Sequence, residues 1–138
     1  MSQFIHIRSN KFPIQPGEEQ ELVNAGMYGR ALAEYLQQQL SSRGHDALLV
    51  YPEDWGWWID LRGTPFKFGA CVYSHPAENG PTEFACTDGA VGRKKWSWKQ
   101  FRSIDTTPWV EQLHADMLAI FQADPDVEVL GVSDEFPF

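Results

Sequence analysis

The stretch of the chain that decides its fold runs from residue 46 to residue 88 and reads DALLVYPEDWGWWIDLRGTPFKFGACVYSHPAENGPTEFACTD. Apolar residues alternate with other residues over Trp55–Arg62 and again over Phe66–Ser74, which is the period of a β-strand. Shorter apolar runs at Asp46–Tyr51 and Glu83–Thr87 predict two more strands. The turns between these strands are too short to carry a parallel crossover, so we expect an antiparallel meander.

Two segments with helical spacing of apolar residues flank this meander. The first runs from about Ala25 to Ser42, with Asn24 as its expected N-cap. The second runs from Thr107 to Ala123, and Pro108 suits its first turn. Residues 11–21 hold two prolines and three glutamates and predict a loop.

Three further strands are expected at Phe4–Arg8, Trp96–Arg102 and Val127–Val132. The resulting order, β-α-β-β-β-β-(β)-α-β, sets consecutive strands between two helices, which is typical of an α+β fold. We therefore predict a single domain over residues 1–138. It should contain one antiparallel sheet of about five to seven strands, with both helices packed on one face.

Composition and charge exclude several classes of protein. A chain of 138 residues that is 43% hydrophobic suits one globular domain and not a disordered chain, and two cysteines are too few for a disulfide scaffold. The net charge of -8 disfavours nucleic acid and anionic membrane surfaces, and favours a basic protein partner. No apolar run is long enough to span a bilayer, and the first residues carry no secretory signal, so we expect a cytoplasmic location.

Residues 52–60, PEDWGWWID, form the first candidate site. Three carboxylates, Glu53, Asp54 and Asp60, surround three tryptophans, and tryptophan is enriched at binding hot spots. Gly56 permits the close approach of a ligand or of a second backbone. The carboxylates also suit an acid/base pair or a hard-cation site, but no spaced-ligand motif supports that interpretation.

The parity of the three tryptophans separates them into two groups. Trp55 and Trp57 share the apolar stripe of their strand, and the simplest interpretation places both in the core beneath the helices. Trp58 breaks that parity, so we expect it to point away from the helices, together with Asp60, onto an exposed surface.

Residues 93–102, RKKWSWKQFR, form the second candidate site and hold five of the chain's 11 lysines and arginines. Basic residues interleaved with aromatics suit single-stranded nucleic acid, an acidic peptide or a phosphate group, although the net charge argues against nucleic acid. The segment also fits a lysine-rich edge strand with inward tryptophans, or a strand that neutralises the nearby carboxylates. The candidate contact residues here are Arg93, Lys95, Trp96, Trp98 and Lys99.

Cys71 and Cys86 lie symmetrically about the turn near Asn79, which places them on adjacent antiparallel strands. In a cytoplasmic chain we expect both to be reduced. His75 is the one nearby metal-ligand candidate, and its spacing fits no established zinc pattern; a Cys-His nucleophile assembled in space stays open. The sequence contains no P-loop and no dinucleotide fingerprint, so we assign no cofactor, no metal and no catalytic residue.

The C-terminal segment Ser133–Phe138 is acidic and aromatic. It fits a docking peptide for another protein, or a tail whose phenylalanines fold back onto the sheet or onto Trp109.

Three motifs resemble those of a group of small uncharacterised bacterial proteins: PEDWGWW at residues 52–58, IDTTPW at 104–109 and DEFP at 134–137. Since the group has no established activity, the resemblance implies no catalytic residues. The small size, acidity and aromatic content are also similar in character to bacterial immunity and inhibitor proteins.

The sequence therefore predicts a non-enzymatic cytoplasmic module that binds a basic protein partner, in the manner of an immunity or inhibitor protein. The alternative is a small enzyme or small-molecule-binding domain. Its pocket would lie between the segments Trp55–Asp60 and Arg93–Arg102.

Overall fold

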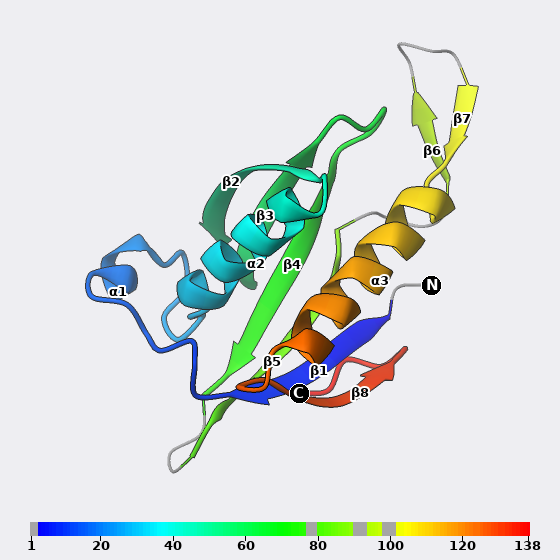
Figure 1. The fold of residues 1–138 in the computed structure, drawn as a ribbon. Helices are drawn as coiled ribbons and strands as arrows, with labels where there is room; N and C mark the ends of the chain where they lie inside the picture. The colour runs from blue at the N-terminus through cyan, green and yellow to red at the C-terminus, as the bar shows by residue number, and fades with distance from the viewer. Residues whose placement is uncertain (1–2, 77–79, 90–93, 98–101) are drawn as a thin grey trace.

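The computed structural model of the 138-residue chain describes residues 3–76, 80–89, 94–97 and 102–138 (Figure 1). Side chains are described outside residues 94–97 and 102–104. The elements, in chain order, are β1 (Phe4–Ser9), α1 (Glu18–Glu21), α2 (Arg30–Ser42), β2 (Asp46–Glu53), β3 (Gly56–Arg62), β4 (Phe68–His75), β5 (Thr82–Asp88), β6 (Lys94–Ser97), β7 (Arg102–Asp105), α3 (Thr107–Ala123) and β8 (Glu128–Ser133).

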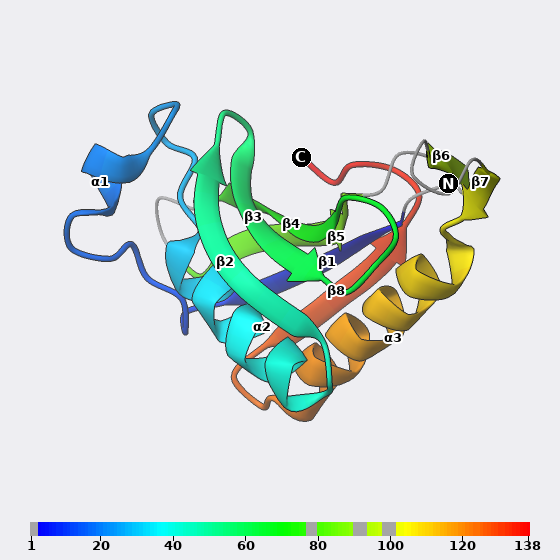
Figure 2. The same cartoon turned by 90° about the horizontal axis from the view of Figure 1, so that it is seen from above.

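Six of the strands form one open antiparallel sheet in the order β2-β3-β4-β5-β1-β8. The meander β2–β5 is the one that alternation predicts, and β1 then inserts between β5 and β8. Figure 2 shows α2 and α3 on one face of this sheet and the C-terminal tail on the other. The predicted α+β fold, with a single antiparallel sheet and two helices on one face, is confirmed.

The core lies between the sheet and the two helices. Strand alternation turns Ile5, Trp57 and Ile59 toward the helices, where each side chain is buried. From α3, Leu113 and Met117 meet them and are fully buried. The bounds of α3 coincide with the predicted helix, because its apolar stripe and its first-turn proline are both local signals.

The first helix and the segment before it differ from expectation. α2 begins at Arg30 and not near Ala25, and residues 18–21 form the short helix α1 and not a loop. The carboxylate of Glu18 is completely buried and accepts hydrogen bonds from the backbone N–H groups of Gly29 (2.8 Å) and Arg30 (3.2 Å). A carboxylate from outside the helix therefore satisfies the first free N–H groups of α2, and this sets its start.

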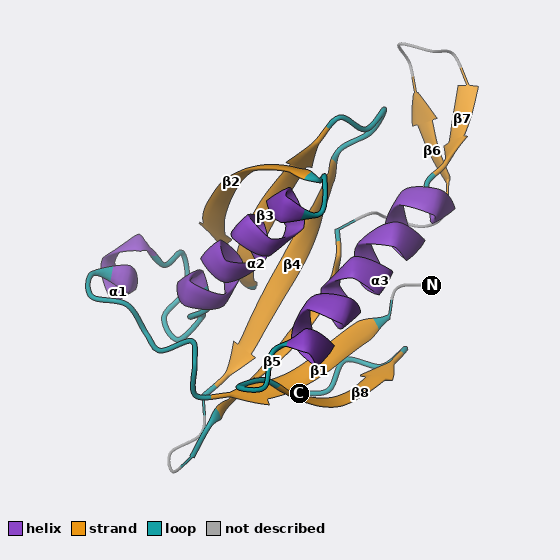
Figure 3. Ribbon diagram, in the orientation of Figure 1, coloured by secondary structure: helices purple, strands orange, loops and turns teal. Residues whose placement is uncertain are grey.

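The predicted strand Trp96–Arg102 is wrong as a single element. β6 and β7 pair with one another in a separate two-stranded sheet, and residues 98–101 between them lie outside the described part of the chain. Figure 3 shows this hairpin standing apart from the six-stranded sheet at the start of α3. Its backbone register sets Lys94 opposite Asp105 and Ser97 opposite Arg102.

Candidate functional site

Only one of the first two tryptophans lies in the core beneath the helices. Trp57 is 1% exposed, and its indole N–H donates to the carbonyl of Met27 at 3.1 Å. Trp55 lies in the turn before β3, so strand alternation does not extend to it, and its ring packs 5.1 Å from that of Tyr73. The absence of a side chain at Gly56 lets the backbone of β4 approach closely, because a Cβ there would lie 2.2 Å from the carbonyl oxygen of Val72.

Trp58 points to the face of the sheet turned away from α2 and α3, which we call the far face, but it is not exposed. Its exposed fraction is 7%, which corrects the prediction of an exposed tryptophan there. The Trp58 ring fits against two glycines that have no Cβ atom. A Cβ added at Gly69 would lie 2.4 Å from the ring, and a Cβ added at Gly89 would lie 2.0 Å from it. Trp58 is therefore part of the packing of the far face.

The three carboxylates of residues 52–60 do not form one cluster. Asp60 is buried, and its carboxylate accepts hydrogen bonds from the Trp58 indole N–H (3.2 Å) and from Arg62 Nε (2.5 Å). Glu53 and Asp54 lie at the other end of the β2–β3 hairpin. At about 3.3 Å per residue, β3 separates Gly56 from Asp60 by roughly 13 Å, and Asp54 lies beyond Gly56 in the turn.

The predicted basic site cannot be placed beside Asp60 from the described residues. Arg93, Trp98 and Lys99 lie outside them, and Lys95 and Trp96 are placed only as backbone on β6. The surface that these residues were expected to share with Trp58 and Asp60 stays a prediction. The same holds for the pocket between the two segments.

Two described cations border the same cavity as Asp60: Arg62, the last residue of β3, and Lys67, which directly precedes β4. Arg62 and Lys67 line a cavity of about 570 Å³ together with Asp60 and Tyr51. Burial, followed by the charges of Asp60 and Glu53, raises the pKa of Tyr51, which keeps its hydroxyl protonated. The alternation of side chains along β3 predicts that Arg62 shares a face with Asp60. Tyr51 and Lys67 come close to Asp60 only because β2 and β4 pair with β3, which the sequence alone does not show.

The two cysteines lie on adjacent antiparallel strands, as predicted, and both are free and buried. The register pairs Val72 with Cys86 and Cys71 with Thr87, so the two thiols point to opposite faces of the sheet. Burial raises the pKa of Cys71 to about 12 and raises that of Cys86 as well. Both thiols are therefore poor nucleophiles.

The histidines of the described residues have structural partners. His114 on α3 lies 2.8 Å from the carboxylate of Asp88, on the face opposite Cys71, so His114 and Cys71 do not form a Cys-His pair. Cys86 shares the face of Asp88, but burial raises the pKa of its thiol. His75 stacks on the ring of Phe138 at 5.0 Å. Within the described ranges, no group of three or more histidine, cysteine, aspartate or glutamate side chains is arranged to hold a metal ion.

The C-terminal tail folds back onto the far face, which is one of the two outcomes expected for it. Phe136 packs against Phe4 (5.4 Å) and Tyr73 (5.0 Å), and Phe138 packs against His6 (5.6 Å). Both phenylalanines nevertheless keep large exposed fractions, 45% and 37%. The tail therefore covers the sheet and at the same time presents apolar surface of its own.

Four of the eight large apolar side chains that are exposed among the described residues fall within nine positions of the C-terminus. We call these residues the C-terminal surface: Leu130, Val132, Phe136 and Phe138. Carboxylates border them in the sequence at Glu128, Asp134 and Glu135. They do not share one face of the sheet, because Val132 lies opposite Ile5, which faces the helices, whereas Phe136 and Phe138 pack on the far face. Exposed apolar residues beside charged ones are nevertheless typical of protein-binding surfaces.

The two edges of the six-stranded sheet differ in how they are protected. β2 carries Pro52 and a register shift near Leu48, and the Gln37 amide donates to the carbonyls of Ala47 and Leu48. Prolines and bulges block the addition of another strand. β8 also carries a register shift, at Leu130 in its pairing with β1, but it contains neither proline nor lysine. In the described part of the chain it is the last strand of its sheet.

No family model, curated protein or solved structure matches this chain. The resemblance of the three motifs to uncharacterised bacterial proteins thus stays a prediction. Among the helices that the structure describes, none has both the length and the apolar character that crossing a membrane requires.

Proposed function

We propose that this protein is a non-enzymatic cytoplasmic module that binds another protein through its C-terminal surface. The observation that carries the proposal is the concentration of exposed apolar side chains on β8 and the tail, at the edge of the sheet that holds no proline. The binding surface is therefore placed at residues 128–138 and not at Trp58, which is buried.

The chemistry of an open edge strand supports strand addition as the mode of binding. Every second backbone N–H and C=O of an edge strand points away from the sheet, and a partner strand can satisfy them. Leu130 and Val132 would then supply side-chain contacts beside the new backbone hydrogen bonds. The other edge is unsuited to this role because Pro52 interrupts it.

The charge of the chain defines the kind of partner. With a net charge of -8 and carboxylates beside the C-terminal surface, association with a basic protein is accelerated by long-range attraction. An acidic module that occupies the surface of a basic protein acts as an inhibitor or immunity protein if that surface is the partner's working site. Added salt should slow the association.

Capture from a lysate of the native host tests the proposal with two matched variants. Val132→Lys places a charge on β8, and Val23→Lys places the same charge at a residue that is 60% exposed in the loop before α2. We expect both variants to melt like the wild type, and only Val132→Lys to lose the captured protein. Equal capture by both variants would show that β8 is not the binding edge.

A further inference from the structure

The positive charges of the described side chains are almost all neutralised within the protein. Five of the six described lysines and arginines pair with a carboxylate: Arg8, Lys11, Arg30, Arg43 and Arg62. The sixth, Lys67, has no carboxylate partner among the described residues. Its ammonium group lies over the ring of Trp58, 5.6 Å from the ring centroid.

Lys67 borders the cavity of about 570 Å³ at the end of β3, together with a second cation that is only partly used. Arg62 donates its Nε–H to Asp60, and its side chain is 56% exposed. A guanidinium has five N–H donors, so the end of the group that carries the two Nη atoms keeps its donors available. The Tyr51 hydroxyl, held protonated, adds another donor to the cavity wall.

Most of the remaining lining residues are apolar, and Thr64, which is polar, donates its hydroxyl to the carbonyl of Phe66. Leu49 and Phe66 border the same space as the donors, and Leu49 is 49% exposed. A cavity of this volume is within the range of small-molecule sites and is far larger than an inorganic anion needs. The lining carries two cations, Arg62 and Lys67, against the single carboxylate of Asp60, which is already bonded to Trp58 and Arg62.

We propose that this cavity binds a small organic carboxylate. The planar end of the Arg62 guanidinium matches the two oxygens of a carboxylate, and Lys67 supplies a second charge-assisted hydrogen bond. The apolar body of the ligand lies against Leu49, Tyr51 and Phe66. Asp60 acts as a positioning residue that holds the guanidinium through Nε.

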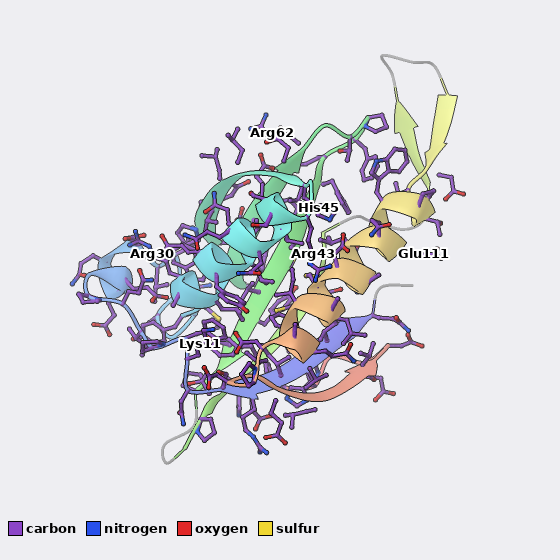
Figure 4. All side chains as sticks on the ribbon, viewed as in Figure 1. Lys11, Arg30, Arg43, His45, Arg62 and Glu111 are labelled. Carbon is purple, nitrogen blue, oxygen red and sulfur yellow. The ribbon has the colours of Figure 1, made fainter. Side chains whose placement is uncertain are left out.

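A second large cavity on the molecule provides an internal comparison. It is about 700 Å³ in volume, and its lining includes Arg8 and Lys11. Figure 4 shows Lys11 well separated from Arg62, with α2 between them in that view. Both of its cations are bound to carboxylates, Arg8 to Glu128 and Lys11 to Asp124. The two cavities are therefore similar in volume, but only the cavity lined by Lys67 has a cation without a carboxylate partner among the described residues.

Nuclear magnetic resonance titration with three probes tests the proposal. Benzoate has the carboxylate and an apolar ring, benzamide has the ring without the charge, and inorganic phosphate has the charge without the ring. The reporter is the indole N–H of Trp58, which is bonded to Asp60 at the floor of the cavity. We expect benzoate to shift this resonance saturably, and benzamide and phosphate to bind at least about tenfold more weakly, since a charge-assisted hydrogen bond is worth about 1.5–3 kcal/mol.

Two variants localise the effect. Lys67→Gln should weaken benzoate binding about tenfold, and Arg8→Gln, an equal change of charge at the other cavity, should leave it unchanged. Equal loss in both variants, tighter binding of phosphate than of benzoate, or no saturable shift at Trp58 would overturn the assignment. Capture of a protein partner through β8 does not depend on this cavity, so the two proposals fail separately.

Discussion

Replacing Glu18 by alanine should destabilise the protein more than replacing any other glutamate in residues 11–21. The carboxylate is fully buried and accepts three backbone hydrogen bonds, from Gln15 (3.0 Å), Gly29 (2.8 Å) and Arg30 (3.2 Å). It joins the loop after β1 to the start of α2. The alanine variant leaves all three N–H groups without their partner.

The magnitude follows from the burial of each bond. An unpaired buried donor costs about 1–3 kcal/mol, and of the three bonds only the one from Gly29 is completely buried. The other two are partly buried and can recruit water, so Glu18→Ala should lose about 2–5 kcal/mol of unfolding free energy. Glu18→Gln should lose about half as much, because its carbonyl still accepts from the start of α2 and only the negative charge and one bond are lost.

Urea unfolding followed by tryptophan fluorescence measures these values, with an unchanged m-value as the sign that the transition stays comparable. Glu19→Ala is the matched control, because Glu19 is exposed and accepts one exposed hydrogen bond from Tyr28 (2.9 Å). We expect the control to lose less than about 1 kcal/mol. A Glu18→Ala variant as stable as the control would refute the role assigned to this carboxylate.

Three further predictions follow from buried groups. Trp58→Ala should lose about 3–5 kcal/mol of unfolding free energy, because the side chain is buried. A variant with nearly wild-type stability would show that Trp58 is not part of the packed interior. Both thiols should resist labelling in the native protein at pH 8, since the pKa of Cys71 is about 12, and should titrate as free once the chain unfolds; rapid native labelling would contradict their burial. Burial raises the pKa of Asp124, but hydrogen bonds from Lys11 and Tyr35 outweigh it and lower the pKa below its ordinary value of 3.8. The ionised Asp124 carboxylate therefore stabilises the folded protein at pH values above 3.8, and this stabilisation is lost as the pH falls through the lowered pKa of the folded state. In Asp124→Asn, acid unfolding should begin at a higher pH, and the free energy of unfolding should depend less steeply on pH.

Local sequence signals predicted most of the fold. Alternation placed Trp57 and Ile59 toward the helices, and the spacing of apolar residues defined α3 to its last residue. The start of α2 could not be found in this way, because it depends on Glu18, which lies 11 and 12 residues before the N–H groups it binds. A contact between distant residues leaves no periodic signal.

The candidate site shows the same division. Parity predicted the face that Trp58 occupies, but its burial depends on Gly69 and Gly89, which belong to other parts of the sheet. The cavity of Lys67 requires the pairing of β3 with both β2 and β4, and the sequence does not specify that register. The exposure of β8 requires the strand order, which places it at an edge.

Hydrogen exchange measured with and without the captured protein tests the central claim most directly. If the partner adds a strand to β8, the amides of residues 128–138 should exchange more slowly in the complex, and those of β2 should not change. Protection confined to β2, or complex formation with no protection of residues 128–138, would contradict the account.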